Sequence, residues 1–221
     1  MKVLAIDTAT ERCSVALRIS GQLIERVVDT PRGHADLVLP MVEETLREAG
    51  LSLSDLHGIA YGRGPGAFTG VRIAIGVVQG LAFGANLPTA GISDLAAVAQ
   101  QVARPGDQVL VCMDARMNEV YWGTFQCAAS GLVIASSTEQ VGRPESVQTS
   151  GVINILAGTG FHAYPQLAAA FNNRVIHERA LPRAAEIALL GEAELRAGRG
   201  RAAADAQPVY LRDQVAVPSR M

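Results

Sequence analysis

One stretch limits what this chain can fold into: residues 62–84, GRGPGAFTGVRIAIGVVQGLAFG, where a glycine-rich loop runs directly into an apolar helix. Glycine and proline crowd the start of the stretch, a composition that lets a backbone approach a ligand or another segment closely. From Val71 onward, Arg72 and Gln79 are the only polar side chains. Because a surface helix normally carries a polar face, both faces of this helix must be covered, within the chain or by a partner.

The composition is that of a globular protein that has no electrostatic reason to bind RNA by itself. Of the 221 residues, 49% are hydrophobic and 18% are charged, which is enough apolar surface to fill a sizeable core. The formal net charge is -2, whereas binding to nucleic acid needs clustered Lys and Arg. If the protein acts on RNA, we expect a partner to hold that RNA.

The sequence predicts a cytoplasmic protein with no membrane partner. The N-terminal run MKVLAIDT is too short for the apolar part of a signal peptide, and charged, Gly or Pro residues interrupt every longer apolar stretch. Cys13, Cys112 and Cys127 lie in or beside apolar runs and lack the spacing of metal ligands. They indicate core residues in a reducing compartment.

The first part of the chain predicts a β-meander followed by parallel strands. Three β-rich runs, separated by short turns, occupy residues 2–7, 13–19 and 22–29. A helix follows over residues 34–49, although Pro40 predicts a kink or a start nearer Leu39. The remaining order is a strand at 56–62, the glycine loop with its helix, a strand at 87–92 and a helix from Ser93. Strands that alternate with helices favour parallel pairing through crossovers.

The pattern restarts after residue 104, which predicts two lobes over residues 1–104 and 105–221. The second unit again reads as a strand, a turn that begins with Asp, a strand, a glycine turn and a strand. Asp7 and Asp114 hold the same place in the two units, so we infer a duplicated architecture. A strand at 152–156, the turn AGTGF and an Ala-rich helix at 183–197 complete the second lobe, which is the shorter one.

Two lobes that each open with a hairpin ending in Asp resemble the actin-like ATPase superfamily, an α/β fold of the RNase H-like type. This resemblance implies that the paired turns face each other across a cleft and contact nucleotide phosphates and a metal. The candidate nucleotide-binding residues are then Asp7, Thr8, Asp114, Gly158 and Gly160, with ATP or ADP as a ligand in the cleft or at a partner interface. The alternative is that the aspartates cap turns and the glycines only permit positive φ.

Four motifs narrow the resemblance: IDTATERCSVAL, GRGPGAFTGVRIAIG, DARMNEVYWGTF and PVYLRD, which together span Ile6 to Asp213. Taken together they resemble the TsaB family, bacterial subunits of the machinery that makes threonylcarbamoyladenosine in tRNA. The resemblance implies a subunit that binds and activates TsaD for threonylcarbamoyl transfer to adenosine 37 of tRNA. It also implies TsaE as a further partner, a homodimer in isolation, and contact with tRNA only through the complex.

The sequence predicts no catalytic residue, no metal ligand and no required cofactor. The catalytic relative TsaD binds its metal through two histidines spaced H-x-x-x-H on a helix, a spacing that places both on one face. The four histidines of this chain are far apart, and the aligned stretch GISDLAAV offers Asp94 and Val98 instead. The alternative is an active ATP-dependent phosphotransferase or ATPase, which Asp7, Asp114 and the turn AGTGF would support.

Helical periodicity divides the apolar helix into two stripes, of which the one with smaller side chains is assigned to the partner. The other stripe, residues 73, 77, 81 and 84, holds the larger side chains and is assigned to the core. The predicted interface includes the neighbouring helix and comprises Val38, Met41, Val42, Val71, Ala74, Ile75, Val78 and Ala82. Two alternatives are open: a second copy of this chain pairs through the same surface, or the helix at 34–49 covers the stripe completely.

Overall fold

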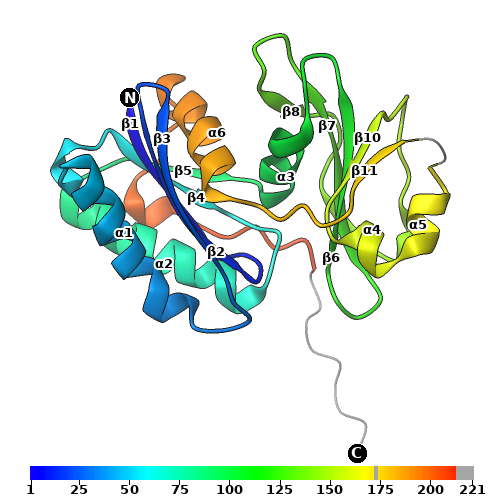
Figure 1. The fold of residues 1–221 in the computed structure, drawn as a ribbon, viewed down its shortest axis with the longest axis horizontal. Helices are drawn as coiled ribbons and strands as arrows, with labels where there is room; N and C mark the ends of the chain where they lie inside the picture. The colour runs from blue at the N-terminus through cyan, green and yellow to red at the C-terminus, as the bar shows by residue number, and fades with distance from the viewer. Residues whose placement is uncertain (172–173, 213–221) are drawn as a thin grey trace, which may run out of the picture.

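The computed structural model describes residues 1–171 and 174–212, which form two β-sheets flanked by helices (Figure 1). The first sheet has the strand order β3-β2-β1-β4-β5. An antiparallel meander forms half of it, and two strands parallel to β1 form the other half. The strands are β1 (Lys2–Asp7), β2 (Arg12–Ile19), β3 (Gln22–Asp29), β4 (Gly58–Gly62) and β5 (Thr89–Ile92).

The second sheet repeats this topology, with the order β11-β10-β6-β7-β8 and β9 paired to β7. Again the opening strands are antiparallel, and two later strands run parallel to the first. The strands are β6 (Gln108–Asp114), β7 (Val120–Cys127), β8 (Val133–Ala135), β9 (Gln140–Gly142), β10 (Ile155–Ala157) and β11 (Val175–His177). The predicted α/β fold class, with two halves that each open with an antiparallel meander, is confirmed.

Helices cover the two sheets unequally. On the first sheet, α1 (His34–Ala49) and α2 (Phe68–Ala85) lie on one face and α6 (Ala184–Arg196) lies on the other (Figure 1). On the second sheet, the crossover between β10 and β11 carries only the short helices α4 (Gly160–Ala163) and α5 (Pro165–Ala169). The remaining helical turns are 3₁₀ segments at Leu53–Asp55, Pro144–Ser146 and Ala203–Asp205. The second half is therefore the smaller one, as predicted.

Helix α1 does not begin near Leu39 as the proline suggested. It starts at His34, runs through Pro40 and ends at Ala49, followed by Gly50, whose φ of 64° is the left-handed conformation that closes many helices. Gly50 N–H donates to the carbonyls of Leu46 and Arg47, so the last turn is satisfied by the backbone. A proline costs the helix one hydrogen bond, which the burial of the Val38, Met41 and Val42 side chains offsets.

The structure places α6 differently from its predicted position in the second lobe, because this helix packs on the first sheet (Figure 1). Strands of that sheet also cap its N-terminus: Ser14 Oγ accepts a hydrogen bond from Ala184 N–H at 2.9 Å, and Glu25 accepts one from Ala185 N–H at 3.3 Å. The chain therefore crosses back to the first sheet before α6. The boundary at residue 104 between two independent lobes stays a prediction.

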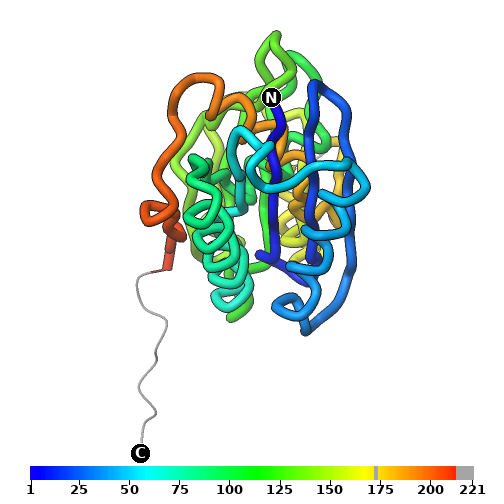
Figure 2. The backbone as a smooth tube through the Cα atoms, turned by 90° about the vertical axis from the view of Figure 1, so that its left-hand side faces the viewer, coloured from blue at the N-terminus to red at the C-terminus, as the bar shows by residue number. Residues whose placement is uncertain are grey.

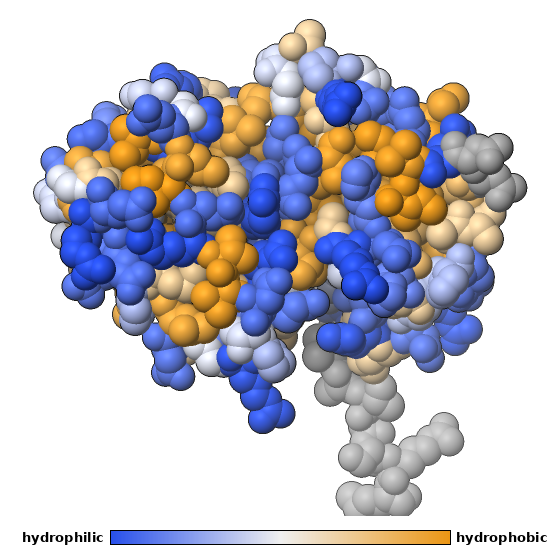
Figure 3. Space-filling model, viewed as in Figure 1, coloured by the Kyte–Doolittle hydropathy of each residue, from blue (hydrophilic) through white to orange (hydrophobic). Residues whose placement is uncertain are grey.

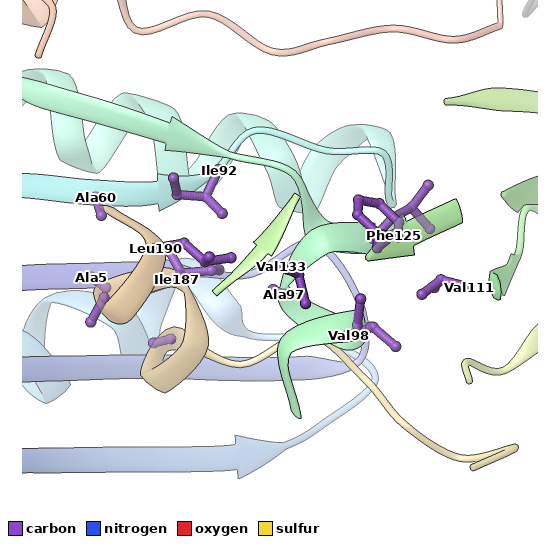
Figure 4. Packing of buried hydrophobic residues seen from close by; sticks show 14 of the residues in the cluster. Ala5, Ala60, Ile92, Ala97, Val98, Val111, Phe125, Val133, Ile187 and Leu190 are labelled. Carbon is purple, nitrogen blue, oxygen red and sulfur yellow. The ribbon is translucent and has the colours of Figure 1, made fainter. Parts of the chain in front are cut away.

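Helix α3 (Asp94–Val102) joins the sheets through one continuous hydrophobic core (Figure 4). Ile187 and Leu190 of α6 lie beside Ala5 and Ala60 of the first sheet. On the other side, Ala97 and Val98 of α3 belong to the same cluster as Val111 and Phe125 of the second sheet. Because this core is shared, the two halves are fixed to each other along one side of the molecule.

Among the described residues, α2 alone is long and apolar enough to cross a membrane, with a mean hydropathy of 1.5 over 18 residues. The apolar character of this helix was predicted, but the expectation that charged, Gly or Pro residues interrupt every membrane-length apolar stretch is wrong for it. One stripe of α2 is buried against the first sheet, where it shares a core cluster with α1 and β1. Figure 2 shows α1 and α2 side by side over that sheet. Helix α2 is therefore a core helix of the folded chain, with its other side uncovered.

Candidate functional site

A cleft of about 860 Å³ lies between the two halves. The first half contributes the β1–β2 loop and the glycine loop, and the second contributes the turn after β6 together with Thr159 and His162. The C-terminal segment 209–212 closes part of its rim. On the face shown in Figure 3, a band of hydrophilic residues separates apolar patches on the two halves. The location matches the cleft that the actin-like resemblance implied.

Thr8 and Asp114 line this cleft, as predicted, but both side chains already have partners. Thr8 Oγ1 donates to the Gly70 carbonyl at 2.7 Å. The Asp114 carboxylate accepts from Arg116 N–H and from the Arg116 guanidinium, both at 2.9 Å, so it caps its own turn. Whether either residue contacts a nucleotide stays a prediction.

Gly158 and Gly160 lie directly against strand β6. A Cβ atom at Gly160 would come within 2.9 Å of the Cys112 carbonyl oxygen, and one at Gly158 would lie closer still to the same oxygen. Gly158 also has a φ of 106°, which side chains disfavour. Both glycines are therefore required by the close approach of the turn to β6. Their role in holding a nucleotide stays a prediction.

Asp7 faces the protein interior, where it meets Asp94 of α3. Both carboxyls are fully buried, and Asp7 Oδ2 and Asp94 Oδ1 each lack a hydrogen-bond donor. The other two oxygens accept backbone hydrogen bonds: Asp7 Oδ1 from Ala9 N–H at 2.9 Å, and Asp94 Oδ2 from Gly64 N–H at 2.6 Å. The pair therefore ties the first turn and the glycine loop to the start of α3.

Burial sets the protonation of this pair. Desolvation raises the pKa of Asp7 to about 6, against hydrogen bonds from Ala9 and Asp94 that lower it. Desolvation and the nearby Asp7 charge raise the pKa of Asp94 well above its ordinary value. Two carboxylates facing each other in a dry site cannot both stay ionised, so a proton on Asp94 is the donor that the pair lacks. The sequence analysis singled out Asp94 only because it stands where TsaD has a metal-binding histidine.

The cleft offers acid–base and hydroxyl groups but little free positive charge. Arg116 is paired with Asp114, and Arg212 binds Glu119. In the first turn, Ala9 N–H bonds to Asp7, so it is not directed at a phosphate. Within residues 1–171 and 174–212, no three His, Cys, Asp or Glu side chains gather as metal ligands would. Whether ATP or ADP binds in this cleft stays a prediction.

The structure contradicts the predicted partner stripe of α2, whereas the larger side chains assigned to the core, Ile73, Val77 and Leu81, are half-buried and do pack against it. The side chains assigned to a partner are buried in the chain's own core, and Val78, at its centre, is 0% exposed. This correction applies to all eight predicted interface residues: Val38, Met41, Val42, Val71, Ala74, Ile75, Val78 and Ala82. The small side chains are needed inside because α2 packs closely on β4 and α1, whereas side-chain size alone had been taken as a sign of a partner.

The side of α2 that points away from the core is uncovered, and we call it the outer α2 face. It comprises Phe68, Arg72, Gly76, Gly80 and Phe83. Phe83 is 82% exposed, and nothing lies within 4 Å of the positions where Gly76 and Gly80 would carry a Cβ. At its N-terminal end, the Arg72 guanidinium lies 3.3 Å from the centre of the Phe68 ring and 4.8 Å from that of Tyr210. Exposed aromatic and arginine side chains are typical of protein interfaces.

Sequence reasoning missed this face, although a signal for it was present. Gly76, Gly80 and Gly84 recur at the four-residue spacing that places them on one side of a helix. Glycine inside a helix costs stability, so a row of glycines favours the side on which another surface can approach. Phe68 and Tyr210 were hidden because they belong to a loop-like stretch and a distant C-terminal motif.

Comparisons with known proteins identify the family. The family model described as TsaD, tRNA N6-adenosine threonylcarbamoyltransferase, matches residues 28–219. The tRNA threonylcarbamoyladenosine biosynthesis protein TsaB of Escherichia coli K12 is 44% identical, with 98% of this chain and 96% of that protein covered. Its Haemophilus influenzae counterpart is 37% identical, with 97% and 95% covered. A solved structure, YeaZ from Pseudomonas aeruginosa, superimposes with a TM-score of 0.86 at 41% identity, covering 95% of this chain and 99% of that chain.

These relatives match the chain over nearly its whole length, including the glycine loop, the turn after β6 and the C-terminal motif. The last residue of that motif, Asp213, lies outside the described residues. The predicted resemblance is confirmed: the chain belongs to the TsaB family of tRNA threonylcarbamoyladenosine biosynthesis proteins.

Proposed function

We propose that this chain is a non-catalytic subunit that binds TsaD and activates it for threonylcarbamoyl transfer to adenosine 37 of tRNA. The observation that carries the proposal is the outer α2 face, a largely apolar helix surface that the chain leaves uncovered. Monomeric proteins rarely expose contiguous apolar helix surface of this kind without a partner for it. Membership of the TsaB family supports TsaD as that partner.

The contact with TsaD is assigned to the outer α2 face in place of the buried stripe. Gly76 and Gly80 allow another backbone to come close, and Phe83 supplies an exposed apolar anchor next to them. Leu39 on the neighbouring α1 is another large apolar side chain that is exposed, at 49%. A second copy of this chain would use the same surface in a homodimer, so homodimer and heterodimer compete for it.

The proposal that this chain is non-catalytic rests on the burial and the hydrogen bonds of the Asp7 and Asp94 carboxyls. Asp7 and Asp94 are fully buried and bind backbone N–H groups, so neither carboxylate is presented to a substrate in the cleft. Val98, one turn after Asp94, belongs to the hydrophobic core. The active ATP-dependent phosphotransferase remains the second candidate, because Thr8 and Asp114 do line the cleft.

The other parts of the proposal concern ligands and location. No cofactor is required, and ATP or ADP is a candidate ligand of the cleft or of the TsaD interface. TsaE is a further partner, and tRNA is contacted only through the complex, since the formal net charge of -2 gives this chain no attraction to RNA. The place of action is the cytoplasm.

Reconstitution tests the proposal. TsaD with this chain and TsaE should convert tRNA in the presence of threonylcarbamoyl adenylate, whereas this chain alone should give only background conversion. Modification by the chain alone would contradict a non-catalytic role. ATP turnover by the purified chain, measured without TsaD or TsaE, distinguishes the two candidates. Turnover supports the phosphotransferase, and its absence is expected for the proposed subunit.

A further inference from the structure

The C-terminal motif crosses from one half of the molecule to the other. Figures 1 and 2 show the segment after α6 running beside α2 before it reaches the second half. Along α2, Gln79 Nε2 donates to the Ala206 carbonyl at 3.0 Å, and Tyr210 stacks on Phe68 with ring centres 6.0 Å apart. The backbone of this C-terminal segment is also held to the glycine loop, because Val209 N–H donates to the Arg63 carbonyl at 2.8 Å.

Arg212 then binds the turn that follows β6 in the second half. Its guanidinium donates to the Ala115 carbonyl at 3.2 Å and to the Glu119 carboxylate. The Arg212 side chain is largely buried, at 18% exposed, so this ion pair is shielded from water on most sides. A charge-assisted bond in such a place is stronger than one on an open surface.

The turn that Arg212 binds has an unfavourable backbone conformation. Arg116, Met117 and Asn118 have φ values of 60°, 54° and 59°, so three consecutive residues with side chains are left-handed. Residues other than glycine adopt this conformation singly and rarely in series. Such a run persists only where surrounding contacts hold it in place. The turn's own bonds are the Ala115–Glu119 and Glu119–Arg116 backbone pairs and the hydrogen bonds from Arg116 to Asp114.

We propose that residues 206–212 are a latch across the cleft, with Arg212 as the positioning residue that holds the turn 114–119 in its left-handed conformation. The shared core around α3 fixes the two halves along one side, and the latch fixes them along the cleft rim. Asp114, which lines the cleft, is the first residue of the held turn. The latch therefore sets the shape of the cleft wall and its access on that side.

Hydrogen exchange on the full chain tests the latch. In the Arg212→Ala variant, the amides of Ala115, Arg116 and Glu119 should exchange about ten-fold faster or more, because the turn loses its main external support. Glu119→Gln keeps a hydrogen-bond acceptor but removes the charge. In this variant the exchange rates of the same amides should lie between those of the wild type and of Arg212→Ala. The exchange rates of the β1 and β2 amides should be the same in both variants as in the wild type, which shows that the fold is intact.

Arg199→Ala is the matched control, since Arg199 also makes a two-bond ion pair, with Glu194, but within one segment. This variant should leave the exchange of residues 114–119 as in the wild type. If Arg212→Ala exchanges at 114–119 no faster than Arg199→Ala, the latch is overturned. The same holds if the acceleration is spread evenly over the whole chain, because Arg212 then supports general stability and not the turn.

Discussion

Asp7 and Asp94 place two carboxyls against each other in a fully buried site between the end of β1 and the start of α3. Gly62 is the neighbour that makes this possible, since a Cβ there would lie 2.6 Å from Asp7 Oδ1 and 2.5 Å from Asp94 Oδ1. Arg12 on β2 and Arg63 in the glycine loop are the nearby cations, and Cys13 feels the Asp7 charge. The site is therefore stable only while the pair retains a proton.

The pair predicts that the chain loses stability as the pH rises. The folded-state pKa of Asp7 is raised to about 6, and that of Asp94 is raised well above its ordinary value, so both lie above the unfolded value. The stabilisation that the protonated pair gives the fold is complete below the pKa of an unfolded aspartate. It is lost as the pH rises through the pKa values of the folded state. Between pH 4 and 7 the free energy of unfolding should therefore fall by about 1–3 kcal/mol, measured by urea denaturation.

Asp94→Asn should flatten this pH dependence and stabilise the chain at pH 8, because the amide donates to Asp7 without a charge. Its carbonyl oxygen can still accept from Gly64 N–H. Asp29→Asn is the control: Asp29 is exposed and paired with Arg12, which lowers its pKa, so that variant should keep the wild-type slope. An Asp94→Asn variant with an unchanged slope would contradict a shared proton.

The strands and the duplicated topology could be predicted from the sequence because they depend on local patterns. Alternating apolar runs and turn residues set β1 to β3, and the same pattern set β6 to β8. The place of α6 could not be predicted in this way. Its N-terminus is capped by Ser14 and Glu25, which lie far away in the sequence, so no local signal assigns it to a sheet.

The candidate site was predicted in part for the same reason. Thr8 and Asp114 follow the strands that were recognised, and the structure brings both to one cleft. The stripe of α2 with the smaller side chains was wrongly assigned to a partner, because side-chain size does not decide which face is buried. Close packing of α2 on the sheet selects small residues such as Ala74 for the inside. The partner of Asp7 was missed because Asp94 reaches it only through tertiary packing.

Two glycines should respond in opposite ways to replacement by alanine. Gly62→Ala should destabilise the chain by about 1–3 kcal/mol, because the new methyl meets both carboxyls of the buried pair. Gly76→Ala should stabilise it by about 0.5–1 kcal/mol, because Gly76 lies inside α2 with open space around it. Thermal and urea unfolding of both variants measures this. If both substitutions change the free energy of unfolding by the same amount, the contact with the carboxyl pair does not explain glycine at position 62, and helix propensity does not explain the effect at position 76.

Ser14→Ala should destabilise the docking of α6 on the first sheet. Ser14 is fully buried, and its Oγ satisfies Ala184 N–H at the first turn of the helix. Losing this cap leaves a buried N–H unpaired, at a cost of about 1–2 kcal/mol. Limited proteolysis should then cleave faster between β11 and α6. Ser136→Ala, at an exposed position, is the control and should cleave at the wild-type rate.

The outer α2 face predicts which substitution separates binding from folding. Gly80→Arg should leave the chain folded, because nothing surrounds that position and the long side chain can extend into water. In the proposed complex the same arginine would be buried without a counter-charge, so affinity for TsaD should fall by about two orders of magnitude or more. Size-exclusion chromatography with TsaD measures the loss, and circular dichroism of the variant alone checks its fold.

Val78→Arg provides the opposite case on the same helix. Val78 is 0% exposed in the chain's own core, so an arginine there should unfold the chain or destabilise it by several kcal/mol. Loss of TsaD binding by this variant would then follow from loss of the fold, which its circular dichroism spectrum records. If Gly80→Arg is folded and still co-elutes with TsaD, the outer α2 face is not the interface. If Val78→Arg is folded and fails to bind, the buried stripe becomes accessible in solution, and the partner contact lies there.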